Sequence, residues 1–60
     1  MENLGICLDG FTALRAEAKS SSEMISSLVF GEQYKIIEEK EEWLKIINRS
    51  DGYEAWMSLS

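Results

Sequence analysis

The stretch QYKIIEEKEEWLKIIN, Gln33–Asn48, is compatible with either a helix or a hairpin, and the fold class depends on which of the two it forms. As a helix, it gathers several side chains near one face, and its central run EEKEE contains no Gly or Pro to interrupt a helix. These side chains are Ile36, Ile37, Lys40, Trp43, Leu44 and Ile47. As a hairpin, Tyr34–Ile36 and Leu44–Ile46 alternate between two faces, with Glu38–Glu42 as the connecting turn. Branched and aromatic side chains favour strands because they pack well on a pleated surface, so local propensity leaves the two readings about equal.

The end of the chain favours the hairpin. Asn48–Gly52 is a cluster of turn-forming residues, and its Asp-Gly pair is typical of hairpin turns. Tyr53–Met57 then alternates in character, which predicts a final strand. A strand directly after a hairpin extends an antiparallel sheet without a long crossover connection. We therefore predict that Gln33–Asn48 forms two paired strands.

The first half of the chain predicts two more strands, because short apolar runs alternate with turn-forming residues. The predicted strands are Leu4–Leu8 and Met24–Leu28, and the predicted turns are Asp9-Gly10 and Phe30–Glu32. Small and polar residues dominate Thr12–Ser22, which we expect to form a long surface loop anchored by Leu14. The expected fold class is all-β, with five or six mostly antiparallel strands.

Length and composition limit the chain to one small domain and exclude several functions. With 60 residues, it buries only about 60% of its unfolded surface, which leaves room for one modest core. Six Lys and Arg oppose eleven Asp and Glu, and this net charge of −5 argues against binding nucleic acid or anionic membranes. The chain has no His and a single Cys, Cys7, so we expect no disulfide, no zinc site, no cofactor and no catalytic constellation.

From Ala13 to Met57, the order of features resembles a bacterial SH3 (SH3b) domain, whose fold is a small SH3-like barrel. The matching pieces are Leu14–Glu17, Ser20–Ser22, Met24-Ile25 with Leu28, Gly31, Tyr34–Ile37, Trp43–Ile46 and Gly52–Met57. More narrowly, RAEAKSSSEM, FGEQYKIIEE, EWLKI and DGYEAW are similar to the N-terminal SH3b domain of NlpC-family cysteine peptidases. Two positions depart from the family pattern, because Ala18 replaces a usual Pro and Ala55 replaces a usual Gly.

The resemblance implies a non-catalytic role in recognising bacterial cell-wall peptides. NlpC-type peptidases cleave γ-D-glutamyl bonds with Cys and His in a separate C-terminal domain. Residues 1–60 would then form one SH3b domain, the N-terminal part of a longer peptidase whose catalytic domain is not in this chain. That domain and the murein stem peptide are the partners implied. Without a secretory signal in this chain we expect a cytoplasmic location, whereas removal of an upstream segment would indicate the periplasm or cell envelope.

Three residues are candidates for contacting the ligand. The Glu17 carboxylate could bind the ammonium at the amino end of a peptide, although an ion pair with Arg15 or Lys19 is the simpler reading. Tyr53 and Trp56, in the closing motif, could offer an aromatic surface. Other chemically suggestive residues have structural explanations. Trp43 is expected to cover the core, Cys7 to be a small buried hydrophobe, and Glu38, Glu39, Glu41 and Glu42 to be solvated.

An alternative function is a structural or protein-interaction module without a cell-wall ligand. Exposed edge strands on so small a barrel could pair with a second copy and form a homodimer. A module for proline-rich peptides is disfavoured, because Trp43 has no neighbouring aromatic residue and the first loop is not rich in aromatic residues.

Overall fold

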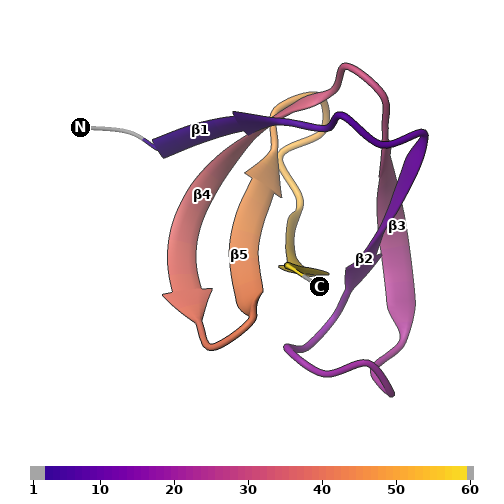
Figure 1. The fold of residues 1–60 in the computed structure, drawn as a ribbon, viewed down its shortest axis with the longest axis vertical. Helices are drawn as coiled ribbons and strands as arrows, with labels where there is room; N and C mark the ends of the chain where they lie inside the picture. Colours follow the sequence, from indigo (N-terminus) through magenta and orange to yellow (C-terminus); the bar gives the residue numbers. More distant parts are fainter. Residues whose placement is uncertain (1–2, 60) are drawn as a thin grey trace.

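The computed structural model describes residues 3–59, which form six strands in one antiparallel sheet. The strands are β1 (Asn3–Ile6), β2 (Phe11–Arg15), β3 (Met24–Val29), β4 (Gln33–Lys40), β5 (Trp43–Asn48) and β6 (Glu54–Ser58). Their order across the sheet is β1-β4-β5-β6-β2-β3, and the sheet curls into a small barrel (Figure 1). The all-β prediction is confirmed. Residues 3–59 contain no helix that could span a membrane.

The central stretch is a hairpin, as predicted, but its turn is shorter than expected. β4 continues to Lys40, which pairs with Trp43, so Glu41 and Glu42 alone connect the strands. The prediction of a turn over Glu38–Glu42 was therefore wrong at its first three residues. Cross-strand pairing with β5 extends β4 beyond the apolar residues that indicated it. Glu41 has a φ of 56°, the left-handed conformation that lets so short a connection reverse the chain.

The prediction of a loop over Thr12–Ser22 was wrong in its first part. Phe11–Arg15 form β2, which pairs along its length with β3, and only residues 16–23 form the loop. Small and polar composition indicated a loop, yet pairing with β3 and burial of Leu14, which is 1% exposed, stabilise a strand there. β6 begins at Glu54, one residue later than predicted, so Tyr53 lies in the preceding loop.

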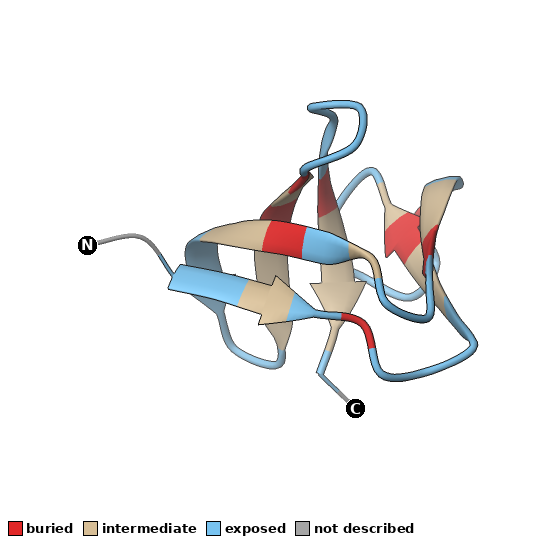
Figure 2. Cartoon of the chain, turned by 90° about the horizontal axis from the view of Figure 1, so that it is seen from above, coloured by how far each residue is buried: buried red, intermediate tan, exposed pale blue. Residues whose placement is uncertain are grey.

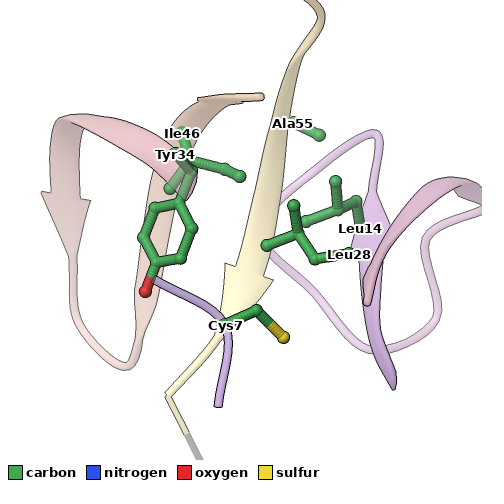
Figure 3. Packing of buried hydrophobic residues seen from close by; sticks show 6 residues of the cluster. All are labelled: Cys7, Leu14, Leu28, Tyr34, Ile46 and Ala55. Carbon is green, nitrogen blue, oxygen red and sulfur yellow. The ribbon is translucent and has the colours of Figure 1, made fainter. Parts of the chain in front are cut away.

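One small core holds the sheet together, and its side chains come from five strands and the segment after β1 (Figure 3). The buried hydrophobic residues are Cys7, Leu14, Leu28, Tyr34, Ile46 and Ala55. Figure 2 shows that buried residues lie in short stretches within the barrel, whereas most of the loop residues are exposed. Cys7 is buried, as predicted. The methyl group of Ala55 belongs to the core, where Ala55 pairs with Ile46 across β5 and β6.

β1 is attached to β4 through a close approach between a glycine and an aromatic ring. Gly5 pairs with Tyr34, and the Tyr34 ring occupies the space that a side chain at position 5 would need. Tyr34 is only 8% exposed, so its ring has little freedom to move away. The absence of a Cβ atom at position 5 therefore lets β1 cover the edge of β4.

Gly5→Ala is expected to lower the free energy of unfolding by about 1–3 kcal/mol, because the added methyl group overlaps the Tyr34 ring. Urea denaturation followed by tryptophan fluorescence measures the change. The matched control is Gly10→Ala, where no atom lies within 4 Å of the added Cβ atom. The control should change stability by no more than about 0.5 kcal/mol. Equal effects at the two glycines would contradict this account of β1.

Burial raises the pKa of the Tyr34 hydroxyl above its ordinary value of 10.0, and the nearby Cys7 thiol raises it further. The unfolded chain releases this proton near its ordinary pKa, whereas the folded protein holds it to higher pH. Its contribution to stability is therefore complete below about pH 10 and is lost as the pH rises through the folded pKa. We expect the free energy of unfolding to fall more steeply above about pH 10 in the wild type than in Tyr34→Phe.

The measurement is urea denaturation at a series of alkaline pH values. Tyr53→Phe is the matched control, because it removes a hydroxyl from an exposed position. Identical pH dependence in the wild type and Tyr34→Phe would show that burial of the Tyr34 hydroxyl does not contribute.

Candidate functional site

A groove with a volume of about 270 Å³ lies between β2, the start of β5 and the end of β6. Its lining combines aromatic, charged and hydroxyl side chains from both halves of the chain. The lining residues are Asp9, Phe11, Thr12, Ala13, Arg15, Ser20, Trp43, Met57 and Ser58. No single sequence motif contains them, and the curled sheet brings them together.

The groove exists because β2 and β6 pair at only one position. Arg15 lies opposite Trp56, and no further register pair joins these two strands within residues 3–59. Continued pairing would place Ala13 beside Ser58, and instead both residues line the groove. Met57 also lines the groove and packs against the core. The divergence of the two strands therefore opens a partly apolar hollow on the barrel.

Trp43 provides the largest aromatic surface of the groove. It is the first residue of β5, directly after the turn, and it pairs with Ser58 at the end of β6. Its side chain is half-buried, which agrees with a covering role over the sheet, and it also lines the groove. Phe11, which is 58% exposed, is the other aromatic residue of the lining. Flat aromatic side chains of this kind offer large contact areas with little loss of conformational freedom.

Arg15 brings the positive charge of the groove, and the loop after β2 holds its side chain. Its Nη1 atom donates a hydrogen bond to the backbone oxygen of Ser22, at 3.2 Å. Ser22 is buried, and its Oγ atom accepts a hydrogen bond from the Glu17 backbone N–H at 2.9 Å. The Ser22 N–H donates to the Lys19 oxygen, at 3.0 Å. These hydrogen bonds of Ser22 therefore hold the β2–β3 loop together beside Arg15.

Trp56 lies between Arg15 and Lys45 in the sheet. Across the sheet, Arg15, Trp56, Lys45 and Glu38 lie opposite one another in a single row. The Lys45 ammonium lies 5.9 Å from the centre of the Trp56 ring and 3.4 Å from a carboxylate oxygen of Glu54. These half-exposed charges contribute little to stability, because solvent screens them. Trp56 is half-buried and does not line the groove.

The structure places Glu17 and Tyr53 in two different loops. Glu17 is exposed in the β2–β3 loop, which also contributes Ser20 to the groove. Tyr53 is 68% exposed in the β5–β6 loop, where its N–H donates to Asp51 Oδ1 at 3.0 Å. The two loops lie at opposite ends of the molecule in the view of Figure 1. Glu17, Tyr53 and Trp56 therefore do not line one shared hollow, and their role in binding stays a prediction.

Sequence reasoning missed Phe11 and Arg15 as groove residues because it assigned most of β2 to a loop. It named Trp43 but gave it a covering role. The signal available for Trp43 was its position as an aromatic residue at the start of a strand, directly after the acidic turn residues Glu41 and Glu42. No group of three or more His, Cys, Asp and Glu residues in the described part of the chain could hold a metal ion.

Two other hollows lie away from the groove and have different linings. A polar hollow of about 420 Å³ lies between the β3–β4 turn and the β5–β6 loop. Its lining includes Asn48, whose Oδ1 atom accepts hydrogen bonds from the N–H and hydroxyl of Ser50. A smaller hollow of about 190 Å³ adjoins Cys7 and Tyr34 at the core. Neither contains a tryptophan or combines an aromatic surface with a cation, so the groove is the best candidate for a ligand site.

Comparison with known proteins identifies the family. No curated protein and no solved structure matches the chain. A family model described as bacterial SH3 domain matches residues 10–60, which is most of the chain and includes every residue of the groove lining except Asp9. The chain therefore belongs to the bacterial SH3 domain family.

Proposed function

We propose that this domain is a binding module that holds the peptide stem of the bacterial cell wall in the groove beside Trp43. Membership of the bacterial SH3 family supports a non-catalytic binding role. The observation that carries the proposal is the groove itself, in which Trp43 and Phe11 lie with an acidic and a basic side chain. The resemblance to NlpC-type peptidases supports the finer proposal that the ligand is murein peptide and the partner a catalytic domain.

The chemistry of the groove suits a short peptide that carries both charges. Arg15 can bind a carboxylate and Asp9 an ammonium, while hydroxyls of Thr12 and Ser20 can bind amide groups. In a γ-linked glutamyl residue the side-chain carboxyl forms the peptide bond, so its α-carboxylate remains free. A stem peptide with such a residue, a free amine and amide groups between them therefore offers a complementary group for each part of the groove.

The size of the groove predicts modest affinity. At about 270 Å³ it lies slightly below the usual range of small-molecule pockets, so it contacts only a short part of a ligand. Weak binding is useful when the module is linked to a second domain that acts on the same ligand, because the linkage raises the effective concentration. This agrees with a role beside a catalytic domain.

Trp43→Ala is expected to weaken binding of the peptide L-Ala-γ-D-Glu-L-diamino acid by about tenfold or more, because the groove loses its largest aromatic surface. Heteronuclear NMR titration measures the dissociation constant and shows whether the variant remains folded. Ile37→Ala is the control, because Ile37 is exposed in β4 and does not line the groove. Unchanged affinity in folded Trp43→Ala would refute the groove as the binding site.

The residues indicated by the resemblance are tested in the same titration with Glu17→Ala, Tyr53→Phe and Trp56→Ala. If Glu17 binds the ammonium of the peptide, Glu17→Ala weakens binding of the free peptide but not of its N-acetylated form. Asp9→Asn is the informative comparison, because Asp9 is the acidic residue of the groove lining. If Asp9→Asn alone removes the difference between the two peptides, Asp9 and not Glu17 binds the ammonium.

A module that pairs with a second copy is the alternative function, and the edges of the sheet favour it. β1 and β3 are the two edge strands, and both carry exposed apolar side chains. These side chains are Leu4 and Ile6 on β1 and Met24, Ile25 and Val29 on β3. An exposed apolar edge can pair with another strand. This alternative predicts no peptide binding in the titration above.

A further inference from the structure

Arg15 differs from the other residues that line the groove in carrying a positive charge. The sequence suggested that it pairs with Glu17, but no ion pair joins Arg15 to an acidic residue within residues 3–59. Its hydrogen bond to the Ser22 oxygen uses one of the several N–H donors of the guanidinium group. In a chain with an excess of acidic residues, a guanidinium group in a groove without an acidic partner retains the capacity to bind an external carboxylate.

We infer that Arg15 determines the specificity of the groove for ligands with a carboxylate, and that Ser22 is the residue that positions Arg15. The inference rests on the proposed function and names the ligand group that the groove selects. The planar guanidinium group can donate two parallel hydrogen bonds to the two oxygens of a carboxylate. A carboxamide is neutral, so it lacks the charge that strengthens this interaction. Asp9, also in the lining, disfavours a second carboxylate in the groove.

Ser22 positions Arg15 through the β2–β3 loop. Its backbone oxygen accepts from Arg15, its N–H donates to Lys19, and its buried hydroxyl accepts from the Glu17 N–H. Ser22 is only 8% exposed, although it lies in a loop of small polar residues. Because backbone and side chain are both engaged, loss of the hydroxyl frees the backbone near Glu17 and loosens the acceptor that holds the guanidinium. A fixed guanidinium loses less conformational freedom when it binds a carboxylate.

The α-carboxylate of the γ-linked glutamyl residue is the group of the stem peptide that Arg15 would bind. Trp43 and Phe11 supply contacts for the apolar parts of the peptide, and these contacts do not depend on the charge of this group. The preference for a carboxylate over a carboxamide therefore reports on Arg15 separately from binding as a whole.

The test compares two peptides, L-Ala-γ-D-Glu-L-diamino acid and the same peptide with the glutamyl α-carboxylate converted to a carboxamide. The wild type is expected to bind the carboxylate peptide about tenfold more tightly, a preference that shrinks as salt is added. Arg15→Gln should bind both peptides about equally, because the group that distinguishes them is lost. Arg15→Lys should keep part of the preference, because it retains the charge but not the planar fork.

Ser22→Ala tests the positioning role against a matched control, Ser21→Ala, at an exposed position in the same loop. We expect Ser22→Ala to reduce the ratio of the affinities for the carboxylate and carboxamide peptides, and Ser21→Ala to leave that ratio unchanged. A loss of stability alone would weaken both peptides alike. If Ser22→Ala keeps the full preference, Ser22 does not position Arg15.

The outcomes separate this inference from the proposed function. If the wild type binds both peptides equally well, the role of Arg15 is wrong and the proposed function stands. If the wild type binds neither peptide, the proposed function fails and the role of Arg15 fails with it. If folded Arg15→Gln and Arg15→Lys both keep the wild-type preference, another group binds the carboxylate.

Discussion

The fold depends on a row of three apolar side chains across its central strands. Ile46 on β5 lies opposite Ile36 on β4 and Ala55 on β6, and Ile46 is fully buried. A chain of 60 residues has room for one core, so the pairing register of β5 determines which side chains enter it. A shift of one residue would place Lys45 in the position of Ile46. The alternation along β5 therefore fixes both the interior and the exterior of the barrel.

The candidate ligand groove is a consequence of the same register. Because Leu44 and Ile46 pack in or against the core, the residues between and beside them, Trp43 and Lys45, lie on the other face of β5. The two-residue turn brings Trp43 to the end of the barrel, opposite Ser58. Within residues 3–59, β2 pairs in register with β6 at Arg15 alone, and its divergence from β6 completes the groove. The packing of Leu44 and Ile46 thus determines which side chains of β5 point away from the core.

The groove separates two contributions to recognition that a binding module must combine. Aromatic and apolar contacts from Trp43, Phe11 and Met57 are tolerant of the exact ligand. In the binding mode that we propose, charged groups at Asp9 and Arg15 select among ligands by disfavouring those that leave a charge unpaired. A small domain has little surface with which to contact a ligand, so charged groups can distinguish between ligands where contact area cannot. The proposal therefore gives the loop that holds Arg15 as large a role as the aromatic side chain of Trp43.

Local sequence was sufficient for the fold class, the central hairpin and the order of features typical of the family, because alternation and turn residues act over a few positions. It was insufficient for β2, since Phe11–Arg15 become a strand through pairing with β3 and burial of Leu14. It was also insufficient for the groove, whose lining extends from Asp9 to Ser58. Residues so far apart in the chain become neighbours only when the sheet curls, and the distances between them depend on register, twist and the single register pair between β2 and β6.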